Sequence, residues 1–259
     1  MEKELERILQ CEKEYTDCTS ICYDRGKYYE YADDKIKDMY DHNFFETKDS
    51  MTDEELQDFV SEETKRRKEN KISYCKVKTG SLPEKIPVDF NGKEPEIEHV
   101  AAYVYKGADT LDWKSVDNCE IKKVTDKSMI KDLIAMDIDV DGKRCTEDFC
   151  RRRAERMGNE YLSDSSLNMY VCYLDGQPVG SCELYMSDKV AKIESFSVLP
   201  KLQRKGIGTT ILKYLMEEAK ENKSDIRYLI ADEDDTPKEM YVKLGFEKLH
   251  DIYSLFWTL

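Results

Sequence analysis

Residues 193–215 read IESFSVLPKLQRKGIGTTILKYL, and this stretch decides the fold of the second half of the chain. Its first six residues alternate between apolar and polar, which predicts a strand. Pro200 ends that strand because proline lacks the N–H that a sheet ladder needs. The basic loop QRKGIGT follows at 203–209. Apolar residues then recur at helical spacing, at Ile207, Ile211, Leu212, Leu215, Met216 and Ala219.

The start of this predicted helix has the properties of a phosphate-binding site. A helix N-terminus presents several unpaired backbone N–H groups and the positive end of the helix dipole. Both features favour an anion, above all a phosphate. Gln203, Arg204 and Lys205 add side-chain donors and positive charge. The sequence therefore predicts a phosphate-bearing ligand beside this helix.

The elements around this stretch predict a mixed α/β (α+β) fold for residues 116–259. A strong hairpin signal lies at Asp175-Gly176, and Gly245 is a helix-stop glycine. The expected strands lie at 119–124, 169–174, 179–186, 193–198, 226–231 and 248–259. The expected helices lie at 128–136 and 146–157, from 207 onward, and up to Gly245. The order is therefore β-α-α-β-β-β-α-β-α-β.

Two motifs in this order resemble the GNAT superfamily of acetyl-CoA-dependent N-acetyltransferases. The pattern Q-x-x-G-x-G at 203–208 resembles the loop of that family, and MYVKLGF at 240–246 resembles the signature at the end of a later helix. The two motifs occur in the family's order and spacing. The resemblance covers residues 119–259 and implies a GNAT-like central mixed sheet flanked by helices.

The resemblance also implies acetyl-CoA as the co-substrate. Backbone N–H groups of the loop would hold the pyrophosphate, and the strand before it would pair with the pantetheine amides as another strand does. An ordinary strand–turn–helix would explain the glycines alone, but it would not explain the second motif. The implied cofactor-binding residues are Phe196, Ser197, Val198, Gln203, Arg204, Lys205, Gly206, Ile207, Gly208 and Thr209.

Acetyl transfer to an amine needs a base for the amine, stabilisation of an oxyanion and an acid for the thiolate. The resemblance implies Tyr241 as the acid. Glu194 could take the amine proton directly or through a water, and a solvated outward residue is the alternative that strand alternation leaves open. The chain departs from the family at Asp234, where an Asn seven residues before the Tyr is common.

The acidic run DIDVDG at 137–142, with Asp148 at position twelve, resembles a calcium loop. Asp in place of Glu at position twelve, Arg144 at position eight and the lack of a second loop argue against calcium. An acidic loop that attracts an amine and a solvated turn are the alternatives. We therefore expect no metal site.

Residues 1–115 predict a smaller α+β domain. They contain an N-terminal amphipathic helix, a Tyr-rich hairpin at 19–32 and a helix capped at Thr52-Asp53-Glu54-Glu55, but no glycine loop. By analogy with tandem GNAT proteins, this part is interpreted as a degenerate GNAT-like module that lost its cofactor loop. The polar stretch at 109–117 places the domain boundary between residues 115 and 116.

Composition restricts the partners. A net charge of −14 opposes binding to nucleic acid or anionic membranes. No apolar run approaches the roughly 20 residues of a membrane helix, and MEKELERILQ lacks the apolar core of a signal peptide. Nine cysteines without a CxxC are typical of reduced thiols. We therefore expect a cytoplasmic protein whose partners include neither nucleic acid nor membrane.

Two functions fit the sequence. The first is an N-acetyltransferase in which a primary amine attacks acetyl-CoA directly. Its acceptor, a small molecule or a protein amine, is expected to be cationic because the protein is acidic. The second is a non-catalytic CoA-binding regulatory module, which would explain Asp234 and the degenerate first half. The sequence leaves the oligomeric state open.

Overall fold

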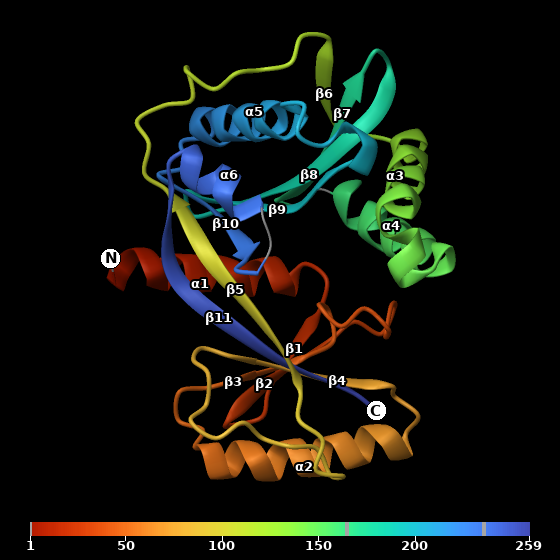
Figure 1. Cartoon of the computed structure of the whole chain (residues 1–259), viewed down its shortest axis with the longest axis vertical. Helices are drawn as coiled ribbons and strands as arrows, with labels where there is room; N and C mark the ends of the chain where they lie inside the picture. The colour runs from red at the N-terminus through yellow and green to blue at the C-terminus, as the bar shows by residue number, and fades with distance from the viewer. Residues whose placement is uncertain (1, 164–165, 235–236) are drawn as a thin grey trace. The chain divides into compact units, whose positions relative to one another are not determined.

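A computed structural model describes residues 2–163, 166–234 and 237–259 of the chain (Figure 1). The chain divides into two compact units, each built from segments that are distant in sequence. The first unit comprises Met1–Thr19, Tyr103–Ile230 and Glu239–Lys248. The second unit comprises Ser20–Ala102, Ala231–Lys238 and Leu249–Leu259.

The first unit contains a mixed sheet, which confirms the predicted fold class. Neighbouring strands are antiparallel except β9 and β10, which are parallel and are joined by the crossover helix α5. In order across the sheet, the strands are β6 (Cys119–Lys123), β7 (Leu167–Leu174), β8 (Gln177–Ser187), β9 (Val190–Val198) and β10 (Ile226–Asp232).

Helices cover both faces of this sheet. A Cβ on Gly180 of β8 would lie 2.7 Å from Ile211 Cδ1 of α5, whereas Glu183, three positions on, contacts Tyr15 of α1. Because side chains alternate along a strand, α5 and α1 cover opposite faces. All six residues of the predicted apolar stripe of α5 are buried. The helices of this unit are α1 (Glu2–Asp17), α3 (Lys127–Cys145), α4 (Glu147–Tyr161), α5 (Ile207–Glu221) and, from Glu239 onward, α6 (Pro237–Lys243).

Helix α1 belongs to the first unit, although the sequence grouped it with the N-terminal domain. The reason is its polar face, from which Glu12 and Tyr15 bind residues of β8, β9 and β10. These partners lie more than 165 positions further along the chain, beyond the reach of local sequence patterns. The boundary between residues 115 and 116 stays a prediction.

The second unit holds the predicted hairpin and the predicted capped helix. Thr52 Oγ1 accepts the N–H of Glu55 at 3.2 Å, and Glu55 Oε2 accepts the N–H of Thr52 at 2.9 Å, which completes the capping box. The unit's elements are β1 (Ile21–Asp24), β2 (Tyr28–Ala32), β3 (Phe45–Thr47), α2 (Asp53–Glu69), β4 (Tyr74–Thr79) and most of β5 (Glu96–Tyr105) and β11 (Phe246–Thr258).

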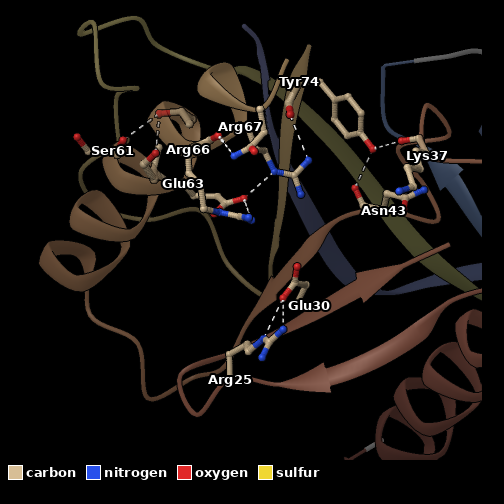
Figure 2. Close-up of polar contacts among 12 residues, drawn as sticks. Arg25, Glu30, Lys37, Asn43, Ser61, Glu63, Arg66, Arg67 and Tyr74 are labelled. Carbon is tan, nitrogen blue, oxygen red and sulfur yellow. Dashed lines mark hydrogen bonds and ion pairs between the residues drawn. The ribbon is translucent and has the colours of Figure 1, made fainter. Parts of the chain in front are cut away.

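Arg67 attaches the C-terminal end of α2 to β4 (Figure 2). Its Nε donates to Glu63 Oε1 at 2.8 Å, and its Nη1 donates to the carbonyl of Tyr74 at 3.2 Å. The guanidinium also lies 4.7 Å from the ring centroid of Phe45. Arg67 is buried, so this basic residue in the last turn of α2 has a structural role.

Candidate active site

Strand β9 leaves β10 partway along its length. Its parallel register with β10 runs from Val190 to Ile193. Beyond that point, the described pairing is with β8 alone, through Glu194, Ser197 and Val198. A strand edge without a neighbour can pair with an extended ligand. The edge at 194–198 is therefore open to the amides of such a ligand.

A β-bulge lies in the same part of β9. Glu183 pairs with Glu194 and Ser181 with Ser197, so two steps on β8 oppose three on β9. Ser195 has φ 50°, in the left-handed region that non-glycine residues rarely adopt. Bulges redirect side chains and interrupt pairing, and they are common beside active sites.

The loop after β9 and the start of α5 together form an anion-binding site. Gly206 is the N-cap residue of α5 with φ 88°, and no side chain caps this helix. A side chain at Gly206 would be strained and would bring Cβ to 3.1 Å from Val116 Cγ2. The loop residues Gln203, Arg204 and Lys205 are exposed. The first-turn N–H groups thus remain available beside two cationic side chains.

The N-terminus of α2 differs in each of these respects. Its N–H groups are engaged by the capping box of Thr52 and Glu55. Asp53, Glu54 and Glu55 fill its first turn with negative charge, which disfavours an anion. Of these two strand–helix–strand crossovers, only that of α5 is suited to a phosphate.

The second GNAT-like motif lies beside the loop. A Cβ on Gly208 would approach Phe196 Cζ to 3.3 Å and Met240 Sδ of α6 to 3.7 Å. The rings of Phe196 and Tyr241 are 6.5 Å apart, and Tyr241 packs edge-on against Phe246 at 6.0 Å. Tyr241 is buried. The structure thus brings the open strand, the glycine loop and Tyr241 together.

Glu194 lies at the point where β9 leaves β10. Its side chain is 30% exposed, and its Oε2 lies 3.0 Å from Nζ of Lys192. Its Oε1 accepts the backbone N–H of Ser195 at 3.3 Å. The carboxylate is therefore partly solvated and held at both oxygens, an arrangement that strand alternation left undecided.

The sequence did not reveal a buried polar cluster around Glu183, the register partner of Glu194 on β8. Glu183 is 1% exposed and accepts hydroxyl hydrogen bonds from Tyr15, at 2.6 Å, and from Tyr161. Burial raises the pKa of Glu183, and the two hydroxyls oppose that shift. Burial also acts to lower the pKa of Lys192, but the carboxylates of Glu12 and Glu194 outweigh it and raise that pKa. The sequence did contain one indication of this cluster, because the charged residues Glu183 and Lys192 stand among apolar residues of β8 and β9.

The acidic run at 137–142 is helical, because α3 continues to Cys145. Arg153 of α4 pairs with Asp137 and, at 2.7 Å, with Asp141, while Arg152 pairs with Asp148 at 2.8 Å. The carboxylates of Asp137 and Asp141 join the two helices, which lie side by side in Figure 1, whereas the pair of Arg152 and Asp148 lies within α4. The calcium-loop, acidic-loop and solvated-turn interpretations of residues 137–142 are therefore wrong, because these residues are helical. Within the described ranges, no group of three or more His, Cys, Asp or Glu could hold a metal ion.

Asp234, where the sequence departs from the family pattern, follows β10 and is exposed. Its N–H donates to Asp232 Oδ1 at 2.7 Å.

No helix in the described residues is both long enough and apolar enough to cross a membrane.

Part of the chain is similar to a known protein family. The model of the Acetyltransferase (GNAT) family matches residues 136–246. An uncharacterized N-acetyltransferase, CgeE of Bacillus subtilis (strain 168), is 25% identical over 256 residues, which cover 95% of each chain.

Solved structures share the fold over nearly the whole chain. A functionally unknown conserved protein from Staphylococcus epidermidis ATCC 12228 has a TM-score of 0.74 at 20% identity, covering 94% of this chain and 95% of that one. A GCN5-related N-acetyltransferase from Kribbella flavida has a TM-score of 0.65 at 13% identity, covering 96% and 94%. A tandem GNAT protein from the clavulanic acid biosynthesis pathway has a TM-score of 0.56 at 11% identity, covering 90% and 78%.

Proposed function

The C-terminal region of this chain is a GNAT acetyltransferase domain, and from that premise we propose that the protein moves an acetyl group from acetyl-CoA to a primary amine. One observation carries the proposal. The uncapped N-terminus of α5, with its glycine and cationic side chains, lies at the end of the strand whose edge is open. Together they suit a ligand with both a pyrophosphate and an amide-bearing arm.

The residues proposed to hold acetyl-CoA divide between the strand and the loop. The open edge of β9 pairs with the amides of pantetheine, as a neighbouring strand would. The N–H groups at the start of α5 bind the pyrophosphate, and the loop side chains add charge. The set comprises Phe196, Ser197, Val198, Gln203, Arg204, Lys205, Gly206, Ile207, Gly208 and Thr209.

The proposed chemistry needs three proton transfers. Glu194 takes one proton from the acceptor ammonium, and the neutral nitrogen then forms a bond to the acetyl carbonyl carbon. The carbon–sulfur bond breaks as Tyr241 donates its phenolic proton to the departing thiolate, and the nitrogen loses its surplus proton to the resulting phenolate through solvent. The partly exposed position of Glu194 supports this role because the carboxylate is accessible to an incoming substrate.

The proposed acceptor is cationic. A net charge of −14 draws cations toward the protein, and an amine that reaches Glu194 as an ammonium ion meets a carboxylate. Polyamines, amino sugars and protein lysine or N-terminal amines all have this chemistry.

A thiol-release assay with a panel of these amines tests the proposal, together with calorimetric titration of acetyl-CoA. Amine-dependent release of CoA, with the acetylated amine found by mass spectrometry, is the expected result. Measurable affinity for acetyl-CoA without turnover on any amine would overturn the enzymatic proposal. That outcome would favour a regulatory CoA-binding module instead.

A further inference from the structure

Lys192 and Glu12 form a chain of charges that ends at Glu194. We propose that these two are positioning residues, which hold the carboxylate of Glu194 toward the acceptor amine. Helix α1 thereby becomes part of the acetyltransferase site. The inference rests on the proposed function and extends it to Glu12, which lies outside the region 136–246 that the GNAT family model matches.

Lys192 lies between the two glutamates, Glu12 and Glu194. Its side chain is 3% exposed, and its Nζ lies 2.8 Å from Glu12 and 3.0 Å from Glu194. The ammonium also lies 4.1 Å from the ring centroid of Tyr15. A buried ammonium is costly unless carboxylates surround it, so the two glutamates and Lys192 depend on one another.

Glu12 anchors Lys192 from α1. Its carboxylate accepts the hydroxyl of Tyr228 of β10 at 2.7 Å in addition to the ammonium of Lys192. A carboxylate with two donors from two strands has little rotational freedom. Glu12 therefore fixes the Lys192 ammonium, and Lys192 in turn fixes Glu194.

The bulge of β9 orients the carboxylate of Glu194. Ser195 donates its N–H to Oε1 of Glu194 while Lys192 binds Oε2, so both oxygens are held. The carboxylate is held where β9 has left β10 and its edge is open. A base that is already oriented spares the reaction the cost of ordering it during amine attack.

Other titratable groups also face the cluster. Glu183 and Cys182 enter from β8, Tyr15 and Cys11 from α1, Tyr161 from α4 and Tyr228 from β10. The glutamate, the cysteines and the tyrosines are neutral or negative, so Lys192 supplies the positive charge among these groups. Removing that charge should therefore affect the protonation of Glu194 directly.

Two substitutions in the full-length protein should move the pH profile of kcat/KM in opposite directions. Lys192→Met removes a positive charge next to Glu194, so the acidic limb should shift by about one pH unit or more toward higher pH. Glu12→Gln leaves the charge of Lys192 to act on Glu194 alone, so the limb should shift toward lower pH. Lys192→Arg should restore most of the wild-type profile.

Glu4→Gln is the matched control. Glu4 is also on α1 and also pairs with a lysine, Lys106, at 2.6 Å, but it lies outside the cluster. It should leave the profile unchanged, and all four variants should keep wild-type affinity for acetyl-CoA. Loss of turnover in both Lys192→Met and Glu12→Gln without a shift of the limb would indicate a structural role and overturn the proposal.

NMR titration of the Glu194 carboxyl tests the coupling without requiring turnover. In protein with ¹³C-labelled glutamate carboxyls, Glu194 is assigned by comparison with Glu194→Gln, and its titration midpoint is followed by NMR. The same opposite displacements in Lys192→Met and Glu12→Gln are expected. Unchanged midpoints would reject the coupling, whereas absence of turnover by the wild type on any amine would reject only the proposed function.

Discussion

Tyr241 is the side chain that supplies the proton to the thiolate in the proposed reaction. Tyr241→Phe keeps the ring and its packing against Phe196 and Phe246, so the fold and acetyl-CoA affinity should be unchanged. Removal of a general acid costs about 10²-fold or more in turnover. The check is kcat from thiol release beside a calorimetric dissociation constant. Wild-type kcat in this variant would exclude Tyr241 as the acid.

Glu183 should make stability depend on pH. Burial raises its pKa above the ordinary 4.5, so the native state binds more protons than the unfolded state. The free energy of unfolding should therefore fall as pH rises from about 4.5 through the raised native pKa.

Glu183→Gln removes this dependence because an amide can accept from one tyrosine and donate to the other. Relative to wild type, the variant should gain about 1.4 kcal/mol between pH 4.5 and pH 8 for each unit by which the native pKa is raised. Urea denaturation at the two pH values measures the difference. The exposed Glu120→Gln is the control, and parallel stability curves for Glu183→Gln and wild type would refute the prediction.

At the scale of elements, the start of α5 should determine acetyl-CoA binding. Gly206→Asp places an anion where the pyrophosphate is proposed to bind, and it also forces a side chain into the left-handed region. Affinity should fall below detection by calorimetry.

Gly176→Asp separates backbone strain from loss of binding. Gly176 also has a left-handed φ, 76°, but a Cβ there would meet no heavy atom within 4 Å. Both variants should lose about 1–2 kcal/mol of stability, whereas only Gly206→Asp should lose acetyl-CoA. Equal affinity of the two variants for acetyl-CoA would contradict the assignment of the loop.

Elements with local signals could be predicted from the sequence. The hairpin at Asp175-Gly176, the capping box at Thr52 and the apolar stripe of α5 each depend on residues a few positions apart. Helix α3 was predicted too short because the acidic run 137–142 suggested a loop. The pairing of those carboxylates with Arg153 of α4, which favours the helix, comes from a later segment.

In the candidate site too, only the residues that belong to local motifs could be predicted. Its loop and Tyr241 belong to motifs that are continuous in sequence, whereas the roles of Glu12 and Lys192 depend on a contact across 180 positions. A single sequence carries no signal for such a pairing, because the spacing between the two residues follows no secondary-structure period.

At the scale of the whole molecule, residues 116–259 should not fold alone, although the sequence placed a domain boundary before them. The first compact unit includes Met1–Thr19, and without α1 the side chain of Lys192 loses Glu12 and the ring of Tyr15. The fragment should lack a cooperative thermal transition and near-ultraviolet dichroism. A cooperative transition in the fragment would support the predicted boundary.

The long separation between α1 and its strands also has a consequence for the time course of folding. Glu12 precedes Lys192 by 180 residues and Tyr228 by 216. At roughly 5–20 residues per second, a ribosome needs about 10–40 s to cover the shorter gap. A lone 16-residue helix is only marginally stable in water. During synthesis, the side chains of Ile8 and Cys11 on α1 therefore stay exposed to solvent until β9 and β10 have been made. In that period, α1 can be bound by a chaperone or can aggregate.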